Sequence, residues 1–167
     1  MKVCRGVLTV VFGVGMVVSA QAEELKKINL DDVNQLGLKL ASDAAVKTEG
    51  AGSIKIVTQW PTTVCLAEIS DVQADNCTLV YKAKVKTDLS AKGSALLEMW
   101  CQVGGGQYFS RGFNSVVSAK GDWKEIQAVF KLEPGQKMEK LTLNLIVNGT
   151  GTVWVDDIVV SQEKLQQ

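Results

Sequence analysis

The chain has 167 residues, and its 18 basic and 18 acidic side chains give a formal net charge of zero at neutral pH. Neither a nucleic-acid-binding footprint nor a polybasic membrane patch is present in such a sequence. The sequence also contains no histidine, which excludes serine–histidine and cysteine–histidine catalysis and the usual zinc sites.

The first 22 residues have the pattern of a secretory signal peptide. Lys2 and Arg5 form a basic start, residues 7–18 are an apolar run, and Ala20 and Ala22 form a small-residue cleavage site. The apolar run is short for a transmembrane helix, and a retained N-terminal anchor is the alternative. We expect a secreted or periplasmic protein that is not inserted in a membrane after cleavage.

Residues 23–35 form a charged lead-in, and from residue 36 the chain becomes a series of short alternating segments. Between residues 79 and 87, for example, apolar side chains alternate with Lys82, Lys84 and Lys86. This period of two predicts a strand with one buried and one exposed face. Three lysines on the exposed face are typical of a solvated surface or a protected sheet edge.

The clearest pattern runs from Lys140 to Val160. Leucines at positions 141, 143 and 145 alternate with polar residues, which predicts a half-buried strand. Gly149 and Gly151 then predict a tight reversal, and the β-branched residues 152–160 predict a closing strand. No helical period is sustained after the signal peptide, and turn signals recur about every ten to fifteen residues. The sequence therefore predicts an all-β antiparallel sandwich over residues 36–161, followed by a polar tail at 162–167.

Three cysteines remain after removal of the signal peptide: Cys65, Cys77 and Cys101. Cys65 and Cys77 are equally distant from Asp71, so a hairpin turning at Asp71 would place them opposite each other. Export permits a disulfide between them, although spacing alone does not fix the connectivity. We expect Cys101, in a strand-like run, to be a small buried hydrophobe.

Four segments resemble a known family in their order and spacing. They are Gly52–Ile56, Ala83–Thr87, Gly121–Ile126 and Gly151–Ile158. The family is that of the carbohydrate-binding modules of the cellulose- and xylan-binding type, which are jelly rolls of the galactose-binding-like superfamily. The resemblance implies a jelly-roll sandwich with one concave sheet that often binds sugar. The match is more specific for the fold than for the ligand.

The same resemblance implies a structural calcium at the edge of a sheet. Asp156 is the expected metal ligand, with Asp157 beside it and Asp31, Asp32 and Glu49 as further oxygen donors. The family usually begins with an Asn-Gly-Phe-Glu-like segment, and this chain has Ile-Asn-Leu-Asp-Asp at 28–32 instead. The alternative is that these aspartates are ordinary acidic residues near a strand end.

The best candidate for a ligand-binding strand is the segment 96–102. Alternation places Glu98, Trp100 and Gln102 on one face. An indole beside a carboxylate and an amide suits a sugar, because the ring stacks on C–H groups while the polar groups bond hydroxyls. Tyr108 and Arg111 follow the triple-glycine turn and would return to this face. The full set of candidate ligand-binding residues is Glu98, Trp100, Gln102, Tyr108, Arg111 and Asn144.

Each of these residues also has a structural interpretation. Trp100 could be a core residue, with Glu98 paired to Arg111 or to a strand lysine. Trp60, next to a proline and a turn, is a candidate for the rim of the site. Two further tryptophans are expected in the core, because each lies in a segment that carries the family resemblance: Trp123 and Trp154.

Paired carboxylates for glycoside hydrolysis are conceivable among Glu98, Glu125 and Asp156, but nothing in the sequence aligns two of them. We therefore expect no catalytic residues. Asn76 and Asn148 match the glycan acceptor pattern, which applies only in a eukaryote. The expected function is that of an exported, monomeric, non-catalytic module whose partner is a glycan or cell-surface polysaccharide. The alternative is a structural or protein-interaction sandwich of the cell envelope without a sugar site.

Overall fold

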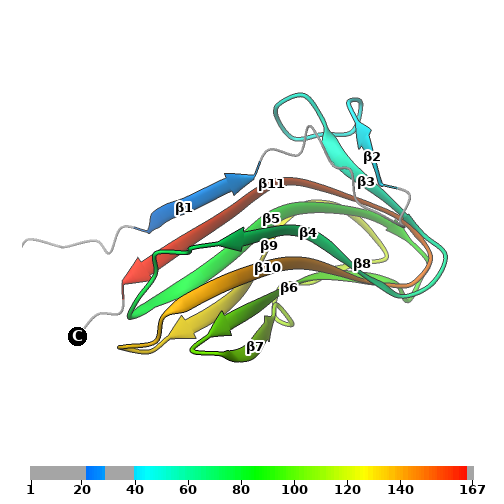
Figure 1. The fold of residues 1–167 in the computed structure, drawn as a ribbon. Helices are drawn as coiled ribbons and strands as arrows, with labels where there is room; N and C mark the ends of the chain where they lie inside the picture. The colour runs from blue at the N-terminus through cyan, green and yellow to red at the C-terminus, as the bar shows by residue number, and fades with distance from the viewer. Residues whose placement is uncertain (1–21, 29–39, 165–167) are drawn as a thin grey trace, which may run out of the picture.

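The computed structural model describes residues 22–28 and 40–164 of the chain. Within these residues the chain forms eleven strands and no helix. The strands form two antiparallel sheets that pack face to face (Figure 1). This sandwich confirms the predicted fold class. No helix in the described part is long and apolar enough to cross a bilayer, and residues 1–21 of the predicted signal peptide lie outside that part.

The larger sheet has six strands, with the order β2-β3-β11-β5-β9 and β1 paired to β11. Strand β1 lies within the expected lead-in. Its apolar residues Leu25 and Ile28 both pack against the core, although they are three positions apart. A β-bulge between Glu24 and Lys26 accounts for this spacing. The strands are β1 (Glu23–Ile28), β2 (Leu40–Asp43), β3 (Ser53–Thr58), β5 (Cys77–Leu89), β9 (Lys120–Leu132) and β11 (Gly151–Lys164).

The smaller sheet has five strands, with the order β4-β10-β6-β7 and β8 paired to β6. Both sheets bend in the same direction, and the smaller sheet lies on the inner side of the bend (Figure 1). Its outer face is therefore the concave side of the molecule. The strands are β4 (Thr62–Ser70), β6 (Ser94–Val103), β7 (Gly106–Arg111), β8 (Val117–Ser118) and β10 (Met138–Asn148).

The core lies between the sheets and is built from the inward side of each alternating strand. In β10, Leu141, Leu143 and Leu145 are fully buried, as the period of two predicts. They belong to the same cluster as Val153 and Val155 of β11 in the other sheet. Burial of such a side chain is worth about 1.5–3 kcal/mol, so the alternating pattern is also the main source of stability.

The glycine-rich reversal after β10 carries the chain from the smaller sheet to the larger one. Gly149 and Gly151 have φ angles of 123° and 140°, which side chains with a Cβ rarely adopt. A Cβ on Gly151 would also lie 2.2 Å from the carbonyl oxygen of Asp88. The predicted reversal is present, but β10 and β11 do not pair with each other. The turn therefore connects the two sheets of the sandwich and is not the turn of a β-hairpin.

The expected disulfide between Cys65 and Cys77 is not formed, and a second connection between the two sheets explains why. Cys65, Cys77 and Cys101 are all free cysteines. The chain changes sheets between β4 and β5, so no hairpin turns at Asp71. Cys65 pairs in register with Asn144 of the smaller sheet, whereas Cys77 opens a strand of the larger sheet. Cys101 is buried as predicted, and burial raises the pKa of its thiol to about 12.

A β-bulge at Asp157 divides one edge of β11 between two strands. Asp157 has a φ of 52°, and the register with β5 shifts between Asp156 and Val159. Strand β3 pairs with β11 before the bulge and β1 pairs with it after the bulge. The Asp157 carboxylate lies 2.9 Å from the ammonium group of Lys27 and 3.0 Å from that of Lys84. The bulge therefore ties β1 to the sheet by charge as well as by pairing.

Asp156 does not fit the expected calcium site. Its buried carboxylate accepts hydrogen bonds of 2.7 Å from both the amide and the hydroxyl of Thr48, and of 2.8 Å from the Asp157 amide. These donors point their positive ends at the oxygens that a cation would need. The described residues contain no group of three or more His, Cys, Asp or Glu side chains that could hold a metal. Asp31 and Asp32 lie outside the described residues.

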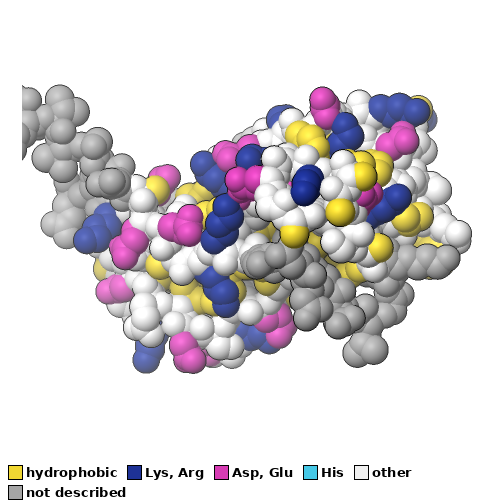
Figure 2. Space-filling model, turned by 90° about the horizontal axis from the view of Figure 1, so that it is seen from above, with side chains coloured by type: hydrophobic (Ala, Val, Ile, Leu, Met, Phe, Trp, Pro, Cys, Tyr) yellow, Lys and Arg dark blue, Asp and Glu magenta, His cyan; other side chains and the backbone are white. Residues whose placement is uncertain are grey.

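Charges on the outer face of the larger sheet are interleaved. Figure 2, which views the molecule from the side of β1, β3 and β11, shows lysines and acidic side chains mixed on this surface. Lys82 lies 3.3 Å from Glu125, and Lys86 lies 2.6 Å from Asp122. The predicted solvated lysine face is therefore neutralised locally and provides no anion-binding patch in these strands.

We predict that Asp156→Ala lowers the free energy of unfolding by about 2–3 kcal/mol, because it leaves the buried Thr48 and Asp157 donors without an acceptor. Urea denaturation measures this effect. Asp122→Ala is the matched control, since it removes an exposed carboxylate and should change stability little. Equal effects of the two substitutions would contradict the role assigned to Asp156.

We further predict that thermal melting curves recorded with calcium and with a chelator superimpose. The Asp156 carboxylate is already satisfied by protein donors, so an added ion would have no stabilising site there. A calcium-bound native state would instead melt at a higher temperature as the ion concentration rises above its dissociation constant.

Candidate functional site

The candidate site lies on the outer, concave face of the smaller sheet. In β6, Leu97, Met99 and Cys101 are fully buried, so alternation turns Glu98 and Trp100 to the outer face. The predicted division of this strand is therefore present. Neighbouring strands β7 and β10 add side chains on the two sides of β6.

One row of polar side chains crosses the three strands and is called the polar row here: Asn144, Glu98 and Arg111. Asn144 of β10 and Arg111 of β7 are the register partners of Glu98. The Asn144 amide donates to Glu98 Oε1 at 3.1 Å, and Arg111 Nε donates to Oε2 at 2.6 Å. The central carboxylate is thus held from both sides of its strand.

Glu98 is a buried charge with three hydrogen-bond donors. It is 3% exposed, and its third donor is the Trp100 indole N–H at 2.9 Å from Oε1. Burial by itself would raise the pKa of Glu98, but the hydrogen bonds from Arg111, Asn144 and Trp100 outweigh it and hold the pKa below its ordinary value. A buried charge is tolerated when it is paired and hydrogen-bonded in this way.

The next row along the sheet is aromatic and is called the aromatic pair here: Trp100 and Phe109. These two residues are register partners on β6 and β7, and their ring centroids lie 5.2 Å apart with the planes tilted by 38°. The Arg111 guanidinium lies 5.0 Å from the Phe109 ring centroid, within the range of a cation–π contact. Phe109 is 52% exposed. An apolar surface therefore lies beside the polar row.

The structure brings together Glu98, Trp100, Arg111 and Asn144 of the predicted set. Gln102 lies one row further along β6, with Lys140 and Gln107 as its register partners. Tyr108 does not belong to this face. It pairs with buried Cys101, and its ring centroid lies 6.5 Å from that of Phe130 in the other sheet.

Phe109 takes the position that the sequence interpretation gave to Tyr108. The signal was available, because Arg111 and Tyr108 are three positions apart and cannot share a face of one regular strand. Phe109 is two positions from Arg111 and can share its face. Placing Arg111 opposite Glu98 therefore selects Phe109.

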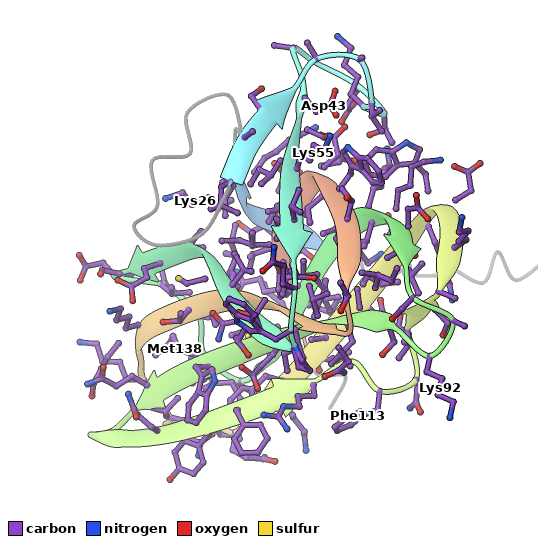
Figure 3. The ribbon with its side chains drawn as sticks, turned by 90° about the vertical axis from the view of Figure 1, so that its right-hand side faces the viewer. Lys26, Asp43, Lys55, Lys92, Phe113 and Met138 are labelled. Carbon is purple, nitrogen blue, oxygen red and sulfur yellow. The ribbon has the colours of Figure 1, made fainter. Side chains whose placement is uncertain are left out.

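Two tryptophans expected in the core are instead only half-buried, namely Trp123 and Trp154. Trp154 alternates with buried Val153 and Val155, so it lies on the outer face of the larger sheet. Its indole N–H donates to Asp43 at 3.0 Å, and the Lys55 ammonium lies 5.7 Å from its ring centroid. Asp43 and Lys55 lie at the opposite end of the molecule from Phe113, which is two residues beyond the end of β7 (Figure 3). Trp60 is 64% exposed.

Two surface pockets lie away from this face. One, of about 460 Å³, is lined by residues 72–75 and 135–137. The other, of about 320 Å³, lies between β1 and the end of β4, with Leu25, Ile69 and Val160 in its lining. Neither is lined by the polar row or the aromatic pair.

The fold was compared with known proteins. No family model and no curated protein sequence matches the chain. Among solved structures, the CBM22-1 xylan-binding domain of Paenibacillus barcinonensis Xyn10C is similar with a TM-score of 0.59 and 15% identity, over 89% of this chain and 99% of that one. A xylan-binding domain from CBM 22 gives a TM-score of 0.56 with 8% identity, over 88% and 96% of the two chains.

A third structure contains more than one module. The N-terminal CBM22-1–GH10 modules of Clostridium thermocellum endo-1,4-β-D-xylanase 10B, complexed with xylohexaose, match with a TM-score of 0.53 and 12% identity. The match covers 89% of this chain but only 29% of that one. At these identities the likeness concerns the fold. The chain has the jelly-roll fold of carbohydrate-binding modules, as the sequence resemblance predicted.

Proposed function

We propose that this chain is a non-catalytic glycan-binding module whose ligand lies on the concave face of the smaller sheet. The aromatic pair stacks on the apolar face of a sugar ring, and the outward groups of Arg111, Asn144 and Gln102 bond its hydroxyls. The single observation that carries this proposal is the aromatic pair, with Phe109 exposed and Trp100 half-buried, lying beside a polar row whose central carboxylate is held by three donors. An aromatic surface next to fixed polar groups is the chemistry that sugars require.

The similar structures support the proposal. Two of them are described as xylan-binding domains, and a third is complexed with xylohexaose. Xylan and related plant or cell-surface polysaccharides are therefore the first ligands to test. The proposed partner is a glycan, not a nucleic acid, and the module acts as an exported monomer in the periplasm or outside the cell.

The positions of the acidic residues support a non-catalytic role. Glycoside hydrolysis needs two carboxyl groups about 5–10 Å apart across one bond. Glu98 is buried in the smaller sheet, whereas Glu125 and Asp156 belong to strands of the larger sheet. Glu125 is exposed beside Lys82, and Asp156 is engaged by Thr48. These three carboxylates do not meet around one ligand.

Trp100→Ala and Phe109→Ala should each weaken polysaccharide binding at least tenfold, about 1.4 kcal/mol, because each removes part of the stacking surface. Affinity electrophoresis in soluble xylan and β-glucan, with pull-down on insoluble xylan and cellulose, measures the change. Trp123→Ala is the matched control, since it removes a half-buried indole from the larger sheet. Failure of the wild-type protein to bind any of these glycans would favour the protein-interaction alternative.

Binding should persist from neutral pH down through the ordinary glutamate pKa of 4.5 and be lost only at lower pH. The pKa of Glu98 is lowered in the folded protein, so the polar row stabilises the native state above the unfolded pKa and loses that contribution as pH falls through the folded value. Titrations of ligand affinity and of unfolding free energy between pH 7 and pH 3 test this. A loss of binding centred above 4.5 would contradict it.

A further inference from the structure

The carboxylate oxygens of Glu98 accept most of their possible hydrogen bonds from other side chains of the protein. Oε1 accepts from the Trp100 indole and the Asn144 amide, and Oε2 accepts from Arg111 Nε. A carboxylate offers about four lone-pair sites, so a single site remains. The side chain is almost fully enclosed, and a ligand lying on the sheet has no open path to that site.

The partners of Glu98 keep groups that can face a ligand. Within the described residues, Arg111 uses only Nε in protein hydrogen bonds, and its two terminal amino groups remain available. The side-chain oxygen of Asn144 likewise accepts no hydrogen bond there. The Trp100 ring presents a face whose plane is set by its N–H bond to Glu98. Donors, an acceptor and an apolar face thus surround a carboxylate that makes no outward contact.

These three partners come from three strands and have no direct hydrogen bond to one another among the described contacts. Side chains of this kind otherwise populate several rotamers. Ordering them when a ligand binds would oppose association. Because the Glu98 carboxylate accepts hydrogen bonds from all three side chains, it orders them before the ligand binds and lowers this entropic cost of association.

We infer that Glu98 is a positioning residue, which orients Trp100, Arg111 and Asn144 for ligand binding and does not contact the ligand itself. The inference rests on the proposed glycan-binding function and assigns its preorganisation to one buried side chain. Glu98→Gln keeps the size of the side chain but replaces one acceptor oxygen with a donor group that opposes Arg111 Nε. The three partners then lose their shared orientation, although the substitution removes no atom of Trp100, Arg111 or Asn144.

A double-mutant cycle separates positioning from direct contact. Trp100→Phe keeps an aromatic ring but removes the N–H that links it to Glu98, and Arg111→Lys keeps the charge but removes Nε. We expect Glu98→Gln to weaken xylan binding about tenfold in the wild-type protein and less than about threefold in either background, because residues that act as a unit are not additive. Isothermal titration calorimetry at pH 7 with soluble xylan or β-glucan gives the affinities.

The matched control is Asp43→Asn on the larger sheet. This change also replaces a carboxylate that accepts from an indole, that of Trp154, and should leave affinity within about twofold of the wild type. A tenfold loss by Glu98→Gln that is equal in all backgrounds would show direct ligand contact and overturn the inference. Unchanged affinity in Glu98→Gln would overturn it as well.

A second experiment, on the protein without ligand, tests the positioning role of Glu98 even if the protein binds no glycan. The chain has four tryptophans, so the indole N–H region of a ¹⁵N–¹H spectrum holds few signals. Glu98→Gln should shift and broaden the Trp100 signal, and Asp43→Asn should move only that of Trp154. Binding of no glycan by the wild-type protein would reject the proposed function alone. An unmoved Trp100 signal in Glu98→Gln would reject the positioning role.

Discussion

The structure depends on burying every second side chain of each strand between two sheets. Because the side-chain period of a strand is two, a shift of one residue would exchange the core face for the solvent face. The fully buried Leu97, Met99 and Cys101 therefore fix which residues of β6 face outward. The candidate site consists of the side chains that these strands turn away from the core. The polar row and the aromatic pair are therefore aligned by the same strand register that buries the apolar side chains.

Two buried carboxylates serve this sandwich in comparable ways. Asp156 gathers donors from the 48–49 loop at a bulge of the larger sheet, and Glu98 gathers donors from β6, β7 and β10 in the smaller sheet. In each case charge-assisted hydrogen bonds offset the cost of burial. They differ in their surroundings. Glu98 lies beside the aromatic pair, so its ordering effect reaches the proposed ligand-binding surface.

The short edge strand β7 contributes to both the site and the closure of the sandwich. Phe109 and Arg111 face the concave side, while Tyr108 turns towards Phe130 of the larger sheet. Ser110 also bonds the backbone of Val129 across the gap between the sheets. One face of β7 is therefore held by the opposite sheet, which gives a firm base to the aromatic and cationic side chains on its other face.

The sequence by itself determined the sandwich, the buried side of its strands and the outward Glu98–Trp100 segment, because alternation and glycine-rich turns act locally. Only the tertiary structure decided which strands are neighbours. Changes of sheet after β4 and β10 separated Cys65 from Cys77, and the β6–β7 register put Phe109 beside Trp100. The tertiary structure also placed Trp154 on the outer face and supplied hydrogen-bond donors from a distant loop to the Asp156 carboxylate. Such contacts depend on pairing between residues far apart in the chain, which a period of two does not encode.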